Sequence, residues 1–163
     1  MKRLLIAIVA AFPFANCMAA INCDQAIRLD AANKLVGGKW FSTSAKEKKN
    51  GSYECVYSLT GGGGELTLTK AHGKLNHTLK SGTMSRLTGV GKNASYFKDT
   101  PKGETPVRGV HATSESGDQY LIELTLKKGD DATSKTYLVD TITALAGATP
   151  VPEKKATQAK APR

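Results

Sequence analysis

Three histidines are the side chains of this sequence best suited to hold a metal ion or to move a proton: His72, His77 and His111. His72 and His77 are five residues apart, whereas side chains that share one face of a helix are three or four apart. A zinc site also needs further nitrogen or sulfur ligands, and no cysteine is expected to be free to join these histidines. We therefore expect ordinary surface histidines, with no metal and no cofactor.

Other residue types give no stronger indication of catalysis. A catalytic serine or cysteine needs a base within hydrogen-bonding reach, and the sequence contains no nucleophile-elbow motif. The glycine run 61–64 lacks the following Lys-Ser or Lys-Thr with which a phosphate loop contacts phosphate. Four carboxylates lie in or beside predicted hairpin turns: Asp118, Glu123, Asp130 and Asp131. Solvated turn residues explain them better than a paired acid and base, so we expect no catalytic residue.

The first nineteen residues have the features of a secretory signal peptide. Lys2 and Arg3 give a positive start, an apolar stretch follows, and small residues precede a cleavage site near Ala19 or Ala20. The apolar stretch is about a dozen residues long, short of the roughly 20 that span a bilayer as a helix. We therefore expect residues 1–19 to be removed and the product to be periplasmic or secreted, with no transmembrane segment.

Removal of residues 1–19 would discard Cys17 and leave two cysteines, Cys23 and Cys55. Disulfides form in the oxidising compartments that exported proteins reach. Cys17 follows Asn16, whereas a lipoprotein signal needs a small residue directly before its acylated cysteine, so we expect soluble export. The two remaining cysteines predict one disulfide, worth roughly 3–4 kcal/mol in the chain-entropy model.

The chain is basic, with a formal net charge of +9 at pH 7. Part of this charge lies in residues 151–163, whose composition of Pro, Ala and Lys predicts a disordered basic tail. The remaining body is too weakly charged for the basic stripe of a dedicated nucleic-acid reader. Nucleic acid is therefore not an expected partner, although the charge fits weak attraction to anionic envelope components.

Residues 20–150 are enough for a single domain with its own core. Asn22 is placed to cap an N-terminal helix that Gly37 and Gly38 end. The apolar residues of this helix recur at helical spacing: Ile27, Ala31 and Leu35, with Ala32 and Val36 beside them. A C-terminal amphipathic helix is predicted from a second such set: Leu138, Val139, Ile142, Leu145 and Ala146.

Alternating apolar residues predict strands between the two helices. One hairpin is expected over 53–59 and 65–70, with Tyr53, Cys55 and Tyr57 facing inward, and another over 107–113 and 119–127. A turn before Phe97 leads into a further strand, and a weaker helical pattern predicts a short mid-chain helix through Leu75, Leu79 and Met84. We predict an α+β fold, an antiparallel sheet of four to five strands packed by an N-terminal and a C-terminal helix, with one disulfide.

One surface combines aromatic and basic residues. Trp40 and Phe41 precede a polar stretch, 42–52, that we expect to be a solvent loop. The candidate binding residues are Trp40, Phe41, Lys46, Lys48 and Lys49. Such an aromatic pair is more often part of the core, and this alternative stays open.

Both cysteines fit a layout that also includes a glycine-rich turn. Cys23 opens the first predicted helix, Cys55 lies in the first predicted strand with Tyr57 nearby, and Gly89–Ala94 has the pattern Gly-x-Gly-x-x-Ala. This layout resembles a group of bacterial envelope proteins best populated by actinobacterial lipoproteins, although Lys92 stands where their turn often has an acidic residue. The resemblance implies a disulfide-pinned α+β sandwich of envelope type, without catalytic residues.

These observations favour a non-enzymatic binding module of the bacterial envelope that acts through a protein partner, for example an inhibitor or immunity protein. Two alternatives stay open. The first is a periplasmic hydrolase that acts on envelope polymers through scattered carboxylates and histidines. The second is a polyanion-binding protein, whose affinity would fall steeply with salt.

Overall fold

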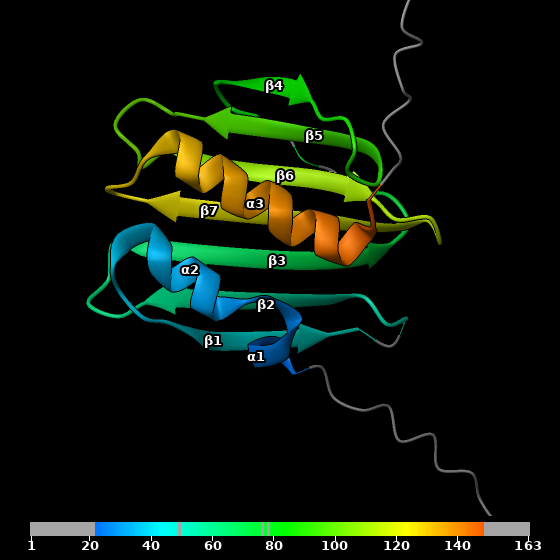
Figure 1. Cartoon of the computed structure of the whole chain (residues 1–163), viewed down its shortest axis with the longest axis horizontal. Helices are drawn as coiled ribbons and strands as arrows, with labels where there is room; N and C mark the ends of the chain where they lie inside the picture. Colours follow the sequence, from blue (N-terminus) through cyan, green and yellow to red (C-terminus); the bar gives the residue numbers. More distant parts are fainter. Residues whose placement is uncertain (1–21, 49, 76, 78, 149–163) are drawn as a thin grey trace, which may run out of the picture.

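Seven antiparallel strands form one sheet in the part of the chain that the structure describes (Figure 1). The structure is a computed structural model and describes residues 22–48, 50–75, 77 and 79–148. In chain order the strands are β1 (Trp40–Glu47), β2 (Tyr53–Leu59), β3 (Gly64–His72), β4 (Gly82–Arg86), β5 (Lys92–Asp99), β6 (Val107–Thr113) and β7 (Asp118–Leu126). Across the sheet the order is β1-β2-β3-β7-β6-β5-β4, so β3 and β7 pair at the centre while β1 and β4 are the edges.

The core lies on one face of this sheet because apolar residues alternate along its central strands. Leu66 and Leu68 of β3 stand opposite Leu124 and Ile122 of β7, and all four side chains are fully buried. Successive residues of a strand point to opposite faces, so these four lie on the same face. This alternation is the pattern that predicted both hairpins.

Three helices cover the same face: α1 (Cys23–Ala26), α2 (Leu29–Val36) and α3 (Asp131–Ala146). α3 crosses β6 and β7, whereas α1 and α2 pack at the β1 end of the sheet (Figure 1). The Asp130 carboxylate caps α3 by accepting from the Thr133 backbone N–H at 2.6 Å. Leu138 and Ile142 then bury one side of α3 on the sheet. The predicted C-terminal helix is confirmed.

The Cys23–Cys55 disulfide joins α1 to β2 and is confirmed. Both cysteines are buried. The Tyr57 hydroxyl donates to the Cys23 carbonyl oxygen at 2.6 Å and so forms a second link between α1 and β2.

The sheet has more strands than the four to five predicted, and the two additional strands are its edges. β1 occupies part of the stretch 42–52 that was expected to be a loop, and β4 includes Met84, which was expected in a helix. Every residue of β4 is exposed, and Trp40 is the one buried residue of β1. Strand prediction depends on buried residues that alternate with exposed ones, and neither edge strand has this pattern.

The predicted continuous N-terminal helix is also wrong. The chain forms two short helices instead, because Ile27 adopts an extended conformation with φ −137° and ψ 162°. Ile27 is buried in this conformation while Cys23 remains in the disulfide. Helical spacing alone did not reveal that both side chains are anchored to the core.

The predicted mid-chain helix is wrong, because the described residues between β3 and β4 (73–75, 77 and 79–81) form no helix. Gln119 of β7 and Asp99 of β5 accept hydrogen bonds from the backbone of these residues. The Leu75 N–H donates to Gln119 Oε1 at 2.7 Å, and the Lys80 and Ser81 N–H groups donate to Asp99 at 2.8 Å each. These acceptors from β7 and β5 take the place of helical hydrogen bonds.

No helix within the described ranges is long and apolar enough to span a bilayer. The predicted signal peptide, residues 1–19, and the predicted basic tail, residues 151–163, lie outside the described residues. Both stay predictions.

Candidate functional site

The predicted binding residues do not share one surface, because neighbours in a strand face opposite sides of the sheet. Trp40 is 4% exposed, and its indole Nε1–H donates to the Ala32 carbonyl oxygen at 3.0 Å. Phe41 is 48% exposed on the other face. Trp40 therefore belongs to the core, as the alternative interpretation had it, and is not available at the surface.

Phe41 and Lys46 lie on the outer face of the edge strand β1, opposite Ser58 and Glu54 of β2. The Lys46 ammonium is 3.2 Å from the Glu54 carboxylate. Lys48 is exposed in the turn after β1, and Lys49 lies outside the described residues. This edge remains a predicted binding surface that lacks the tryptophan.

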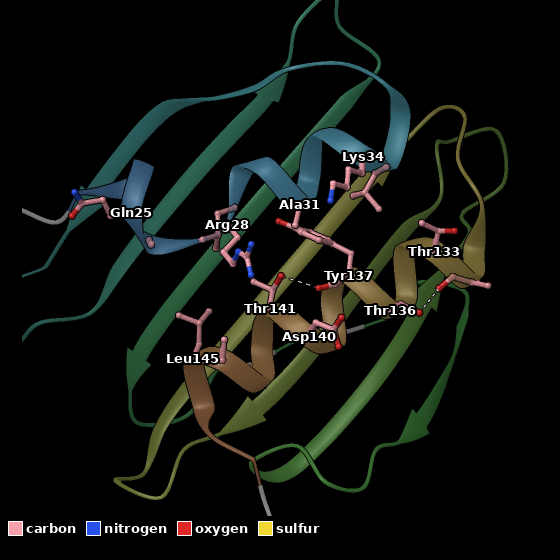
Figure 2. Close-up of a pocket in the computed structure, with 15 residues that line it drawn as sticks. Gln25, Arg28, Ala31, Lys34, Thr133, Thr136, Tyr137, Asp140, Thr141 and Leu145 are labelled. Atoms are coloured by element: carbon pink, nitrogen blue, oxygen red, sulfur yellow. Dashed lines mark hydrogen bonds between the residues drawn. The ribbon is translucent and has the colours of Figure 1, made fainter.

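A groove of about 740 Å³ lies on the opposite face, between the two helical segments (Figure 2). We call it the helix groove. One wall comes from α1, α2 and the residues that join them, and the other comes from α3. The lining residues are Gln25, Ala26, Ile27, Arg28, Ala31, Lys34, Leu35, Ala132, Thr133, Thr136, Tyr137, Asp140, Thr141, Ala144 and Leu145.

The helix groove has an apolar interior made largely of small side chains. Ile27, Ala31 and Leu35, the apolar series predicted for the first helix, all line it. Ala144 and Leu145 line it from α3. Ala31 and Leu35 are only half-buried, so part of the apolar stripe that the sequence assigned to packing faces this groove.

Tyr137 is the polar group most deeply placed in the helix groove. Its side chain extends from α3 toward Arg28, Ala31 and Lys34 on the opposite wall (Figure 2). Tyr137 is 7% exposed, and its hydroxyl has no hydrogen-bond partner among the described residues. The Thr141 hydroxyl donates to the Tyr137 backbone carbonyl at 2.8 Å.

Burial raises the pKa of Tyr137 to about 12; the neighbouring Thr141 hydroxyl opposes the rise, and the negative charge of Asp30 in α2 adds to it. The phenol is therefore neutral at physiological pH. It keeps a proton to donate into the groove.

The two walls carry opposite charges. Arg28 and Lys34 lie on the α2 wall, and Asp140 lies on the α3 wall. Arg28 pairs with Asp30 at 3.1 Å, an exposed contact. Lys34 and Asp140 form no ion pair with any other residue that the structure describes. The α2 wall is thus the basic side of the helix groove.

Each histidine lies beside a different partner. His72 pairs with Asp118, His77 Nδ1 lies 3.4 Å from Glu123 Oε1, and the His111 ring lies 3.3 Å from Gln119 Oε1. Within the described ranges, no group of three or more His, Cys, Asp or Glu residues could hold a metal ion.

All four carboxylates predicted in or beside turns have altered pKa values: those of Asp118, Asp130 and Asp131 are lowered, and that of Glu123 is raised. Burial raises the pKa of Glu123, with His77 opposing the rise. Glu123 lies in the middle of β7, so its assignment to a turn was wrong. Burial alone would raise the pKa of Asp118 as well, but Lys70 and His72 together lower it.

Sequence reasoning did not single out Tyr137, Arg28 or Lys34. A signal was present in the closing segment, where a stripe of Thr133, Tyr137, Thr141 and Ala144 runs at helical spacing beside the apolar positions. A helix seated on a sheet leaves such a flanking stripe free to face a neighbour. The position of α2 beside it was not visible from the sequence.

The arrangement is suited to binding: an apolar groove, one buried neutral hydroxyl and walls of unequal charge. Comparison of the chain with protein-family models, curated proteins and solved structures finds no match.

Proposed function

We propose that this chain is an exported, non-enzymatic binding module of the bacterial envelope that holds a segment of a protein partner in the helix groove. The observation that carries the proposal is the groove itself, with Tyr137 buried and unpartnered in it. Its volume of about 740 Å³ falls within the range of roughly 300–1,000 Å³ typical of ligand sites.

The construction of the two walls supports capture of a polypeptide segment. Grooves that receive helices or strands present an apolar floor between polar rims. Here Ala31, Leu35 and Ala144 supply apolar surface, while Arg28 and Asp140 supply polar rims of opposite charge. The sheet beneath and the disulfide at α1 hold these walls before a partner arrives, which lowers the entropic cost of binding.

The predicted export, the single disulfide and the resemblance to envelope proteins support a site of action in the periplasm or outside the cell. An inhibitor or immunity role is one form of this proposal, in which the groove holds part of a secreted toxin or hydrolase. Co-expression with toxins encoded beside the gene tests it. Protection is the supporting result, and absence of both protection and complex formation counts against the role.

Selection from a random peptide library displayed on phage tests the groove directly. We expect enriched peptides to lose binding at least about tenfold in Ala31→Trp, because the indole fills the apolar interior; tenfold corresponds to about 1.4 kcal/mol. Ser58→Trp is the matched control, since Ser58 stands opposite Phe41 on the outer face. It should leave peptide affinity unchanged.

If Ser58→Trp weakened peptide binding and Ala31→Trp did not, the binding site would be the edge around Phe41 and Lys46. The proposal that the helix groove binds the partner would then be wrong. Selection of no peptide that distinguishes Ala31→Trp from the native chain also counts against the proposal.

A further inference from the structure

We infer that the segment held in the helix groove is apolar and carries an acidic side chain, Asp or Glu, that lies against the α2 wall and accepts from Tyr137. This inference rests on the proposed function and names the chemistry of the partner. Three observations point to it: a buried donor without an acceptor, a basic wall beside that donor, and a remaining lining that carries no charge.

The first observation is the Tyr137 hydroxyl. Buried polar groups are nearly always hydrogen-bonded, and one left unpaired calls for an explanation. Tyr137 is 93% buried, and no described residue accepts its proton. The phenol stays protonated at neutral pH, so it needs an acceptor. A carboxylate oxygen is the strongest acceptor that a protein segment offers.

The second observation is the charge beside that hydroxyl. Figure 2 shows Tyr137 extending toward the wall that carries Arg28 and Lys34. Asp30 partly neutralises Arg28, and no described residue pairs with Lys34. A carboxylate on this side therefore meets a hydroxyl donor, the unpaired ammonium of Lys34 and the guanidinium of Arg28, against the single negative charge of Asp30. On the other side it would meet Asp140 and be repelled.

The third observation limits how much of the segment is charged. The remaining lining carries no charge: it consists of apolar side chains such as Leu35 and Leu145 and of uncharged polar ones such as Thr141. Large apolar side chains would remove this surface from water, at about 25 cal/mol per Å² of apolar area. One acidic residue between apolar neighbours matches the lining better than a run of acids.

The charge of the α2 wall also argues against self-occupancy by the chain's own end. That end carries four cations and one acid: Lys154, Lys155, Lys160, Arg163 and Glu153. Arg28 and Lys34 would repel it. Deletion of residues 151–163 should therefore leave the affinity of groove peptides unchanged.

The test is a peptide array in which each apolar framework appears with Glu, Gln or Lys at one polar position. We expect Glu versions to bind about tenfold tighter than Lys versions, and Gln versions to fall between them. In Tyr137→Phe the advantage of Glu over Gln should fall about fivefold, because one charge-assisted hydrogen bond is lost. This variant should fold normally, since the hydroxyl it removes has no partner within the described chain.

A second variant, Arg28→Glu with Lys34→Glu, should reverse the preference toward Lys versions. Both residues line the groove from its rim, so folding should be unaffected. Lys46→Glu with Lys48→Glu makes the same charge change at the β1 edge and is the matched control, which should preserve the preference for Glu.

The outcomes separate the two proposals. Peptides that bind in the groove without preferring Glu, or whose preference survives both groove variants, overturn this inference and leave the proposed function standing. Binding of the fluorescent fatty acid cis-parinaric acid, with no peptide binding, overturns both and assigns the groove to lipid. Tighter binding after deletion of residues 151–163 would show that the tail competes for the groove, and would overturn the charge argument.

Discussion

The two helices that wall the groove are held on the sheet by different means. α3 is 16 residues long and buries five of them. α2 is eight residues long, buries only Ala32 and has no side-chain cap. Its position depends instead on its neighbours: the disulfide at Cys23, and the Trp40 indole that donates to the Ala32 carbonyl oxygen.

The two helices therefore respond to different changes: α3 to changes in its buried side chains, and α2 to loss of either tether, the disulfide or the Trp40 hydrogen bond. The α3 wall is part of the core, so its position changes only when the core is disturbed. The α2 wall is held by partly buried side chains and a few specific bonds, so it can loosen while the sheet and α3 stay folded. The width of the groove should therefore be more sensitive to the tethers than the overall fold is.

The largest effect is expected from the α3 side. Leu138 is fully buried between α3 and the sheet, and Leu138→Ala should lower the free energy of unfolding by about 3–4 kcal/mol, through lost burial and the cavity left behind. Chemical denaturation followed by circular dichroism measures it. A loss below about 1 kcal/mol would show that α3 is not held by its buried side chains.

Removal of the disulfide should have an effect of similar size that falls on a different part of the molecule. Cys23→Ala with Cys55→Ala releases a closed loop with a sequence separation of 32, which costs roughly 3–4 kcal/mol of stability in the chain-entropy model. Hydrogen exchange should show lost protection in residues 23–36 before α3 is affected. Equal loss of protection in α2 and α3 would contradict the idea that the disulfide holds α2 while buried side chains hold α3.

The central part of the fold was predictable from the sequence because its strands are buried on one side. The strands over 53–59 and 107–113 match β2 and β6 residue for residue. Cys55 and Tyr57 of β2 alternate with less buried residues, and so do Val110 and Ala112 on either side of His111. The edges were missed for the converse reason. β1 and β4 pair along one side only and bury almost nothing, so their identity as strands is decided by the neighbouring strand.

The candidate site was less predictable than the fold. The apolar residues of its α2 wall were identified as a helical stripe, yet helical spacing does not distinguish a stripe that packs from one that lines a groove. Ala32 is fully buried, whereas its neighbour Ala31 is only partly buried against the core and also lines the groove. The distinction depends on where α3 lies, a contact between segments about 100 residues apart.

A smaller effect is expected when the second tether of α2 is removed. Trp40→Phe keeps an aromatic ring in the core but leaves the Ala32 carbonyl oxygen without the indole donor. We expect a loss of about 1–2 kcal/mol from the hydrogen bond and the reduced packing. Amide exchange in α2 should accelerate more than exchange in α3. Phe41→Leu is the matched control on the exposed face and should change neither.

The smallest effects concern the acidic residues at the start of each helix. Lys98 and Arg108 hold the pKa of Asp131 below its usual range at the start of α3, and Arg28 does the same for Asp30 in α2. A carboxylate with a lowered pKa in the folded state adds stability above its unfolded pKa, near 3.9. That stability is lost as the pH falls through the folded value.

Asp131→Asn should therefore lower the melting temperature at neutral pH. In strong acid the variant and the native chain should have the same melting temperature. The effect should stay small, because Asp131 is about half exposed and water screens its pairs. Asp30→Asn should have less effect still, since both members of the Arg28–Asp30 pair are mostly exposed, whereas Arg108 is buried. Melting curves from pH 3 to pH 7 measure both variants. A larger pH-dependent loss from Asp30→Asn would mean that α2, too, is held by a buried electrostatic contact, and the contrast between the two walls would fail.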